Sequence, residues 1–276
     1  MITAVSPRYA VFGQPIAHSL SPRIHAMFGA QLGIAIDYRA IEAGAAQFMS
    51  ALAAFADDGG RGANVTLPLK ETAFALCTQV SERAQRAGSV NTLIRAGDAW
   101  RGDSTDGAGL LRDLRERHAI EPRGLRILLL GAGGAARAAA FAFADEGASE
   151  LVVANRTYAR ADALARALSA RACAWGALAA EYAFDIVVNA TAAGHDGDAF
   201  ELPRNVLAAS TLCYDLSYGN AAQPFIACAR AAGATRLGDG LGMLVEQAAE
   251  SFALWHGRRP DTAPVYAQLR AAGARP

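Results

Sequence analysis

The segment at residues 131–136, GAGGAA, restricts the fold more than any other part of the chain. It has the form G-x-G-x-x-A and follows the apolar run 127–130, which predicts a strand buried on both faces. The alanine-rich residues 135–144 are expected to form a helix, and the apolar residues 151–154 are expected to form a second strand. In this context the glycines allow a tight turn and close approach of a pyrophosphate to the helix N-terminus. The sequence therefore predicts a doubly wound α/β dinucleotide-binding domain, with a plain glycine-rich turn as the alternative.

The end of the second strand indicates which dinucleotide is bound. NAD-binding domains place an acidic residue there, roughly 20 residues after the glycines, to accept a hydrogen bond from the ribose 2′-hydroxyl. Residues 155–160, NRTYAR, contain no acid. Arg156 and Arg160 are four residues apart and have planar guanidinium groups that suit a phosphate, and Thr157 can cap the following helix. We expect NADP as the cofactor; two solvated arginines are the alternative.

Two further strands of this domain are expected at residues 184–189 and 211–216. The loops that follow them, 190–194 and 217–219, lie at the carboxyl ends of the strands, where open parallel sheets bind ligands. Both loops should therefore face the cofactor. Tyr218 is either a site residue or a half-buried aromatic at the sheet edge.

The first hundred residues predict a separate α/β unit. Strands are expected at 9–12, 37–41, 64–67 and 89–93, and helices at 45–55 and 71–77. Ser21 followed by Pro22 is typical of a helix N-cap with proline at the first helical position. Ser19 and Ser21 either serve only this local role or form a receptor for a substrate carboxylate at the helix N-terminus.

Lys70 is the first candidate for chemistry, because it opens a predicted helix where the helix dipole disfavours a cation. The strand before it is expected to present Asn64 and Thr66 on one polar face. Asn91 lies on a short predicted strand, and Asp106 lies in a glycine-flanked turn. These groups indicate a substrate site. The alternatives are a solvated lysine and an aspartate that only caps the next helix.

Charge and composition disfavour several classes of protein. Lys+Arg and Asp+Glu both number 26, without a basic stripe or acidic tail, so we expect no nucleic-acid partner. No apolar run reaches the length of a membrane span, and residues 1–7 do not resemble a signal peptide. The four cysteines form no C-x-x-C pair, and the five histidines no metal-ligand cluster. We expect a cytoplasmic protein with unpaired thiols and no metal.

Six motifs, in this order, resemble the shikimate dehydrogenases, the NADP-linked enzymes of the shikimate pathway. They are GQPIAHSLSP at 13–22, ANVTLPLK at 63–70, AGSVNT at 87–92, GDSTDG at 102–107, NRT at 155–157 and DGLGML at 239–244. The resemblance spans nearly the whole chain and is far more specific than the glycine loop alone. Ser104, Ala136 and the pair at 192–193 depart from the common asparagine and serines, which puts a phosphate contact in doubt.

The resemblance implies a role for each matching residue. Lys70 and Asp106 would be the catalytic pair, with Lys70 protonating the oxygen of a ketone as hydride reduces it, and acting as the base in reverse. Shikimate or 3-dehydroshikimate would be bound by Ser19, Ser21, Asn64, Thr66, Asn91, Asp106, Tyr218 and Gln247. NADP would be bound by Gly131, Ala132, Gly133, Gly134, Ala135, Ala136, Asn155, Arg156, Thr157, Arg160, Thr191, Leu216, Gly240, Met243 and Glu82.

The expected organisation is a substrate domain at 1–106, a Rossmann-type NADP domain at 107–241 and a C-terminal helical segment at 242–276 that packs back on the first domain. The resemblance leaves a homodimer possible. An NAD-dependent quinate/shikimate dehydrogenase and a non-catalytic NADP-binding protein of the same fold are the main alternatives. A scaffolding protein fits the density of site-like motifs poorly.

Overall fold

The computed structural model describes residues 7–191 and 201–273, so the pair at 192–193 lies outside the described residues. Contacts divide the chain into unit 1, Met1–Gly109 with Leu244–Ala267, and unit 2, Leu110–Met243 with the C-terminal residues from Gln268. Three helices have residues in both units, namely α5 (Asp106–His118), α10 (Leu241–His256) and α11 (Ala263–Ala271). Each unit contains one six-stranded sheet.

The division places the residues from Gln268 in unit 2, whereas the sequence led us to expect the whole of 242–276 on the first domain. The physical reason is an ion pair near the end of α11. The Arg270 guanidinium donates to both carboxylate oxygens of Asp239, whose side chain is fully buried. A bidentate pair of this kind fixes the last turn of α11 within unit 2.

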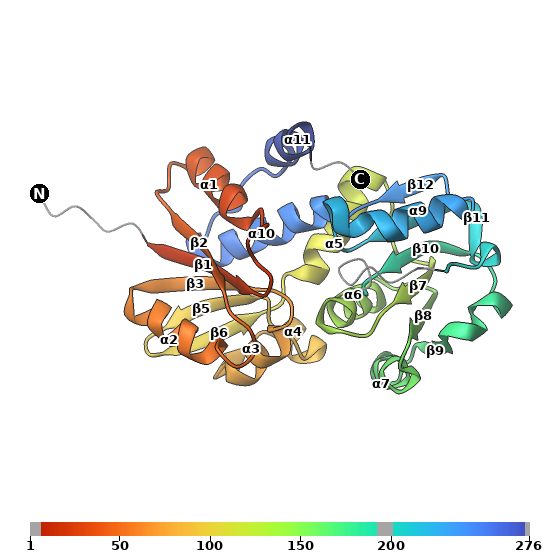
Figure 1. Ribbon diagram of the computed structural model, residues 1–276, viewed down its shortest axis with the longest axis horizontal. Helices are drawn as coiled ribbons and strands as arrows, with labels where there is room; N and C mark the ends of the chain where they lie inside the picture. The colour runs from red at the N-terminus through yellow and green to blue at the C-terminus, as the bar shows by residue number, and fades with distance from the viewer. Residues whose placement is uncertain (1–6, 192–200, 274–276) are drawn as a thin grey trace, which may run out of the picture. The chain divides into compact units, whose positions relative to one another are not determined.

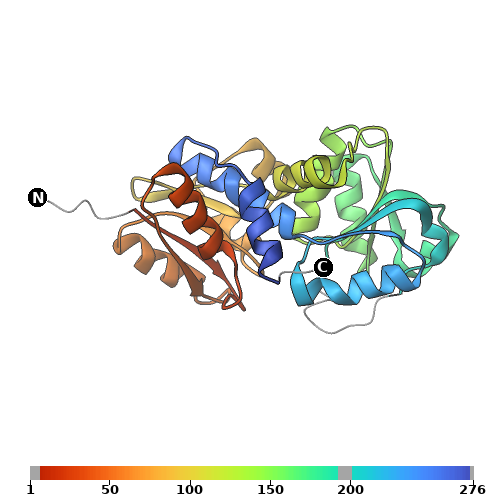
Figure 2. The ribbon, with the colours of Figure 1, turned by 90° about the horizontal axis from the view of Figure 1, so that it is seen from above.

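Unit 1 is built on a mixed sheet of order β2-β1-β3-β5-β6-β4, in which β5 runs antiparallel to both β3 and β6. Its own elements are β1 (Arg8–Gly13), α1 (Ser21–Leu32), β2 (Asp37–Glu42), α2 (Phe48–Asp57), β3 (Gly60–Val65), α3 (Lys70–Leu76), β4 (Gln79–Val80), α4 (Glu82–Ala87), β5 (Thr92–Ala96) and β6 (Ala99–Asp103). In Figures 1 and 2, α1 and α10 cover one face of this sheet, and α2 covers the other.

The alternation of side chains along β1 explains the two layers on its sheet, because successive residues of a strand point to opposite faces. Ala10 and Phe12 belong to a buried cluster with Phe48 and Leu52 of α2. On the opposite face, Tyr9 stacks on Trp255 of α10, with ring centroids 4.7 Å apart. Both faces of the β1 strand are therefore buried.

Three local expectations for unit 1 are wrong in detail. Leu20, rather than Ser21, is the N-cap of α1; Ser21 is the first helical residue, and its backbone N–H donates to Ser19 Oγ over 3.3 Å. The strand expected at 64–67 ends at Val65, because Thr66 opens a turn and Leu67 is 52% exposed. The strand expected at 89–93 begins only at Thr92.

Unit 2 has a parallel sheet of order β12-β11-β10-β7-β8-β9, which confirms the expected doubly wound α/β fold. The strand order reverses between β7 and β10, and such a switch point is where this fold binds its ligand. The elements are β7 (Arg126–Leu130), α6 (Gly134–Asp145), β8 (Glu150–Asn155), α7 (Tyr158–Leu168), β9 (Arg171–Ala174), η1 (Trp175–Ala180), β10 (Phe184–Asn189), η2 (Arg204–Val206), β11 (Leu207–Asp215), η3 (Gly219–Ala222), α9 (Gln223–Ala231) and β12 (Arg236–Gly238).

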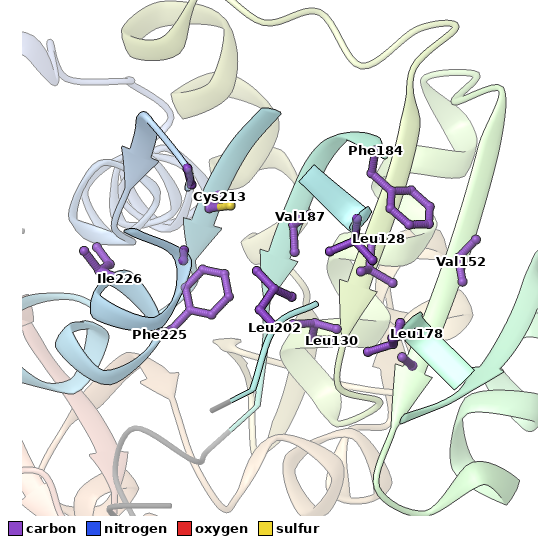
Figure 3. Close-up of a cluster of buried hydrophobic side chains, with 14 of the residues drawn as sticks. Leu128, Leu130, Val152, Leu178, Phe184, Val187, Leu202, Cys213, Phe225 and Ile226 are labelled. Carbon is purple, nitrogen blue, oxygen red and sulfur yellow. The ribbon is translucent and has the colours of Figure 1, made fainter. Parts of the chain in front are cut away.

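The core on one face of this sheet is a continuous apolar cluster (Figure 3). Leu128, Val187 and Cys213 contribute from the three central strands, and Phe225 and Ile226 contribute from α9. All five side chains are at most 1% exposed. Burial of this kind stabilises a side chain by about 1.5–3 kcal/mol, so the strands that carry the glycine loop rest on a rigid base.

Candidate active site

Lys70 and Asp106 meet within unit 1, at the first residues of α3 and α5. Lys70 Nζ lies 2.5 Å from Asp106 Oδ2, and the two side chains are 17% and 7% exposed. The carboxylate offsets the unfavourable position of the cation at a helix N-terminus. The pair therefore presents a charged ammonium group, held in place by a buried acid and still in reach of solvent.

Asn91 fixes the second oxygen of the acid. Its Nδ2 donates to Asp106 Oδ1 over 2.9 Å and also lies 3.1 Å from Gln247 Oε1. Gln247, on α10, donates its own Nε2 to the Leu244 carbonyl oxygen. Asp106 is thus held through one oxygen by an amide and through the other by the lysine.

Asn64 joins the same network from the end of β3. Its Nδ2 donates to Ser251 Oγ over 2.9 Å and to the Asn91 carbonyl oxygen over 3.2 Å. Its Oδ1 accepts a hydrogen bond of 2.7 Å from the hydroxyl of Tyr38. Asn64, Asn91, Asp106 and Gln247 are all buried. The structure therefore brings together five of the predicted residues, Lys70 among them, in one hydrogen-bond network.

The predicted carboxylate receptor adjoins this network, because Ser21 is hydrogen-bonded to the Tyr38 hydroxyl, which itself donates to Asn64. Ser21 is buried. Burial of Tyr38 raises the pKa of its hydroxyl well above the usual value, and the hydrogen bond from Ser21 opposes this rise. Ser19 and Thr66 are half-buried. The Thr66 backbone N–H donates to the Phe12 carbonyl oxygen, and the Thr66 carbonyl oxygen accepts from the Leu69 N–H, each over 2.9 Å. These two hydrogen bonds hold Thr66 beside the end of β1.

His25 is a buried imidazole that packs among aromatic rings beside Asn64. It stacks on Tyr38 with centroids 4.3 Å apart, and its side chain is 0% exposed. Neither ring nitrogen has a partner with normal hydrogen-bond geometry among the described residues. Burial first, and then the nearby His256, lower the pKa of His25 to about 3, opposed in part by Asn64. The ring therefore stays neutral.

His25→Phe is expected to make the stability of the protein less sensitive to acid. Between pH 3 and 6.5 the unfolded chain binds a proton at this histidine and the folded chain does not, so stability falls as pH falls through that window. At pH 5 the effect amounts to about 2 kcal/mol. Urea unfolding at pH 7 and pH 5 measures the decrease in the free energy of unfolding between the two. This decrease should be smaller by that amount in His25→Phe than in the wild-type protein. The same change at exposed His18 is the control; equal losses in both variants would contradict the buried neutral ring.

The glycine loop of unit 2 connects β7 to α6, as predicted. Gly131 has φ +115°, and a Cβ there would lie 2.8 Å from the Ala190 carbonyl oxygen, so this position requires glycine. Gly133 is the N-cap of α6, and a Cβ on it would point into open space. An uncapped, side-chain-free helix N-terminus beside a strand end fits a dinucleotide pyrophosphate.

The segment after β8 also fits the predicted 2′-phosphate. Arg156, Thr157 and Arg160 are exposed, and Asn155 Nδ2 donates to the Thr157 carbonyl oxygen over 3.0 Å. Thr157 is the N-cap of α7, as expected, but its side chain makes no capping bond. Its hydroxyl is therefore not committed to the helix.

The carboxyl ends of β10 and β11 are joined by buried polar groups. Asn189 donates to Asp215 Oδ2 over 2.7 Å and accepts from the backbone and side chain of Thr191. The Leu216 backbone N–H donates to the Asn189 carbonyl oxygen over 2.8 Å. Burial raises the pKa of Asp215 to about 7, against hydrogen bonds from Asn189 and Ser217. These bonds hold Thr191 and Leu216 at the edge where the fold binds its ligand.

The remaining predicted residues are distributed over both units. Gly240 and Met243 are buried in unit 2, and a Cβ on Gly240 would collide with the Leu216 carbonyl oxygen. Tyr218, also in unit 2, is half-buried as the N-cap of η3. Glu82 is exposed at the first position of α4 in unit 1, where an acid also has a local role with the helix dipole.

Metal and membrane features were also sought in the part of the chain that the structure describes. Residues 7–191 and 201–273 contain no group of three or more His, Cys, Asp or Glu side chains that could hold a metal ion. None of the described helices has the length and hydropathy needed to cross a membrane.

Sequence reasoning missed Tyr38, Thr92, Thr105 and Ser251 as members of the site network. Ser251 gave one usable signal, because it lies four residues after Gln247 on the same helix and therefore on the same face. Tyr38 lies in an ordinary strand, and Thr92 is only the neighbour of Asn91. Their contacts depend on the tertiary fold.

The comparisons with known proteins cover nearly the whole length of the chain. Residues 11–93 match the shikimate dehydrogenase substrate binding domain, residues 114–201 the shikimate / quinate 5-dehydrogenase family, and residues 240–270 the shikimate 5'-dehydrogenase C-terminal domain. The chain is 57% identical to the shikimate dehydrogenase (NADP(+)) of Xanthomonas campestris pv. campestris (strain 8004), over 97% of this chain and 96% of that protein.

Solved structures agree with this assignment. An Ael1 enzyme from Pseudomonas putida has 46% identity and a TM-score of 0.87, over 96% of this chain and 98% of that one. Shikimate 5-dehydrogenase from Thermus thermophilus, in complex with NADP(H) and shikimate, has 36% identity and a TM-score of 0.83, over 96% and 99%. With its motifs, its two sheets and the network around Lys70, the chain belongs to the shikimate dehydrogenase family.

Proposed function

We propose that this protein catalyses the reversible, NADP-dependent reduction of 3-dehydroshikimate to shikimate. The observation that carries the proposal is the buried contact between Lys70 and Asp106, held in place by Asn91. It occurs in a chain of this family that has arginines and no acid at the end of β8.

The choice of residue at position 70 supports a proton-transfer role. Lys70 is the only lysine in the whole sequence, and every other residue counted under Lys+Arg is an arginine. A guanidinium group remains protonated at any working pH, whereas an ammonium group can give up its proton. A chain that uses arginine for all its other positive side chains has a lysine where the reaction needs a removable proton.

NADPH, when bound, supplies the hydride for this reaction. Lys70 Nζ gives a proton to the oxygen that gains negative charge, and the ammonium charge stabilises that oxygen before the proton moves. Asp106 orients the ammonium group through Oδ2, while Asn91 prevents Asp106 from turning. In the oxidative direction Lys70 takes the proton back.

The binding roles of the remaining groups are those that the family resemblance implies. Asn64, Thr66, Asn91 and Gln247 supply hydrogen-bond partners for ring hydroxyls, and Ser19 and Ser21 take the carboxylate at the N-terminus of α1. The family resemblance also assigns Tyr218 to the ring hydroxyls. The glycine loop takes the pyrophosphate, and Arg156, Thr157 and Arg160 take the 2′-phosphate. Thr191, Leu216, Gly240, Met243 and Glu82 complete the cofactor contacts.

The test is the absorbance of reduced nicotinamide when purified protein is mixed with shikimate and NADP or NAD, with quinate in parallel. We expect NADP reduction with shikimate. NAD reduction with quinate would instead support the broader quinate/shikimate dehydrogenase, and no turnover in any mixture would support a non-catalytic NADP-binding protein. We also propose a cytoplasmic location. The oligomeric state is a separate question, and sedimentation velocity distinguishes a monomer from a homodimer.

A further inference from the structure

Three buried hydroxyl groups lie beside the Asn91 amide, and the proposed chemistry does not use them. Thr92 on β5, Thr105 before α5 and Ser251 on α10 are each 0% exposed, and we call them the hydroxyl cluster. Thr92 Oγ1 lies 2.8 Å from Ser251 Oγ, and Thr105 Oγ1 lies 3.3 Å from it. Burying three hydroxyls is unfavourable unless each finds partners, so their partners indicate what they do.

Groups that can only donate or only accept fix the direction of the Asn91 amide. The Thr105 backbone N–H donates to Asn91 Oδ1 over 2.7 Å, so this atom must be the oxygen. The amide nitrogen then faces the Asp106 carboxylate. A reversed amide would place its oxygen against Asp106, and the pair would repel each other.

The same reasoning fixes the Asn64 amide. The Asn91 carbonyl oxygen can only accept, so the Asn64 atom 3.2 Å from it is the nitrogen, and Tyr38 must donate to Asn64 Oδ1. Asn64 Nδ2 donates to Ser251 Oγ over 2.9 Å, so the Ser251 hydroxyl has its proton left for one of two acceptors, Thr92 Oγ1 at 2.8 Å and the Gln247 carbonyl oxygen at 3.0 Å. Donation to the nearer Thr92 leaves the Thr92 proton for Asn91 and gives a chain of hydrogen bonds with one direction.

Thr92 is the member of the cluster that contacts both amides. Its Oγ1 lies 3.2 Å from Asn64 Nδ2, accepts from the Ser251 hydroxyl over 2.8 Å, and donates to Asn91 Oδ1 over 3.1 Å. Ser251, on α10, contacts Thr92 Oγ1 and Asn64 Nδ2 and so fixes the position of both groups. Both side chains act on Asp106 only through an amide.

We propose that Thr92 and Ser251 are positioning residues that hold the Asn91 amide with its nitrogen toward Asp106, and so hold Asp106 against Lys70. This inference rests on the proposed function, because it assigns the hydroxyl cluster to the reaction at Lys70. It predicts that loss of the Thr92 hydroxyl lowers turnover more than substrate affinity, because Asp106 shifts relative to Lys70 while Ser19, Ser21 and Thr66, which Thr92 does not contact, still bind the substrate.

The test compares Thr92→Val with Thr92→Ser and Ser251→Ala. Valine keeps the shape of threonine and removes its hydrogen bonds; serine restores the hydroxyl. Thr211→Val in unit 2 is the matched control, since Thr211 is also 0% exposed and its hydroxyl donates to the Phe184 carbonyl oxygen over 2.6 Å. We expect kcat to fall about tenfold in Thr92→Val and in Ser251→Ala, with a smaller change in the KM for shikimate and with recovery in Thr92→Ser.

A second readout does not depend on turnover. Because Lys70 is the only lysine, protein labelled with [13C]lysine gives one side-chain Cε resonance. Thr92→Val should displace this resonance, and Thr211→Val should leave it in place. An unchanged resonance, unchanged kcat in folded Thr92→Val, or a failure of Thr92→Ser to recover would overturn the inference. If Thr92→Val does not fold, Ser251→Ala decides by the same two readouts. Wild-type protein inactive with shikimate would count against the proposed function, while the resonance would still test the positioning.

Discussion

Lys70→Ala is expected to lower kcat by about 10³-fold with little change in the KM for shikimate. The substitution removes the group that gives the proton and the charge that stabilises the reacting oxygen. It leaves Asn64, Asn91 and Gln247, which are expected to bind the ring hydroxyls. Initial rates with NADP and varied shikimate measure both constants. A kcat within about tenfold of wild type would contradict a proton-transfer role for Lys70.

Lys70→Arg separates the two contributions of this residue. Arginine keeps a positive charge beside Asp106 but does not release its proton at the pH of the assay. A kcat as low as that of Lys70→Ala would show that proton transfer dominates. Substantial recovery would show that Lys70 acts mainly through its charge. Thermal unfolding of both variants is the control for folding, because Lys70→Ala leaves the 7%-exposed Asp106 side chain without its ion-pair partner.

The double variant Arg156→Ala/Arg160→Ala is expected to raise the KM for NADP about 100-fold and to leave the KM for NAD nearly unchanged. Each charge-assisted hydrogen bond to a phosphate is worth about 1.5–3 kcal/mol, and NAD has no 2′-phosphate to lose. Kinetics with each dinucleotide at saturating shikimate measure the effect. An equal rise for NADP and NAD would indicate damage to the whole cofactor site.

Arg166 provides a control on the same helix as Arg160. It lies in the last turn of α7, where it pairs with Asp162 over 2.9 Å, and its side chain is 80% exposed. Arg166→Ala removes a positive charge from this unit without touching the predicted phosphate site. We expect wild-type KM values for both dinucleotides. A rise in the KM for NADP similar to that of the double variant would mean that general charge, rather than a built site, selects the cofactor.

Local patterns gave reliable predictions for unit 2 because its structure follows from contiguous residues. The apolar run before Gly131, the helix after it and the strand at β8 form one uninterrupted segment, and the predicted strand at 184–189 matches β10. A buried parallel strand is apolar throughout, so its pattern is strong. The predictions in unit 1 were weaker at their ends, as at Leu67, because exposed apolar residues can continue an alternating pattern beyond the strand.

The residues that form turns and helix caps were also only partly predictable from the sequence. Ser-Pro at 21–22 correctly indicated the start of α1, but the hydroxyl that meets the first turn belongs to Ser19. A cap is defined by backbone angles as well as by residue type, and several residues in that loop could have supplied it. The sequence pattern therefore located the helix without identifying the capping group.

The sequence by itself predicted the dinucleotide fold, the arginine-bearing segment proposed to select NADP and, through the family motifs, the pairing of Lys70 with Asp106. Only the tertiary structure decided how Asp106 is held. Asn64 and Ser251 are 187 residues apart, and Asn91 and Gln247 are 156 residues apart. Bonds over such separations depend on how α10 packs on the sheet of unit 1, where buried polar atoms must find partners from distant segments. Periodicity and spacing describe neighbours along the chain, so they could not reveal the hydroxyl cluster.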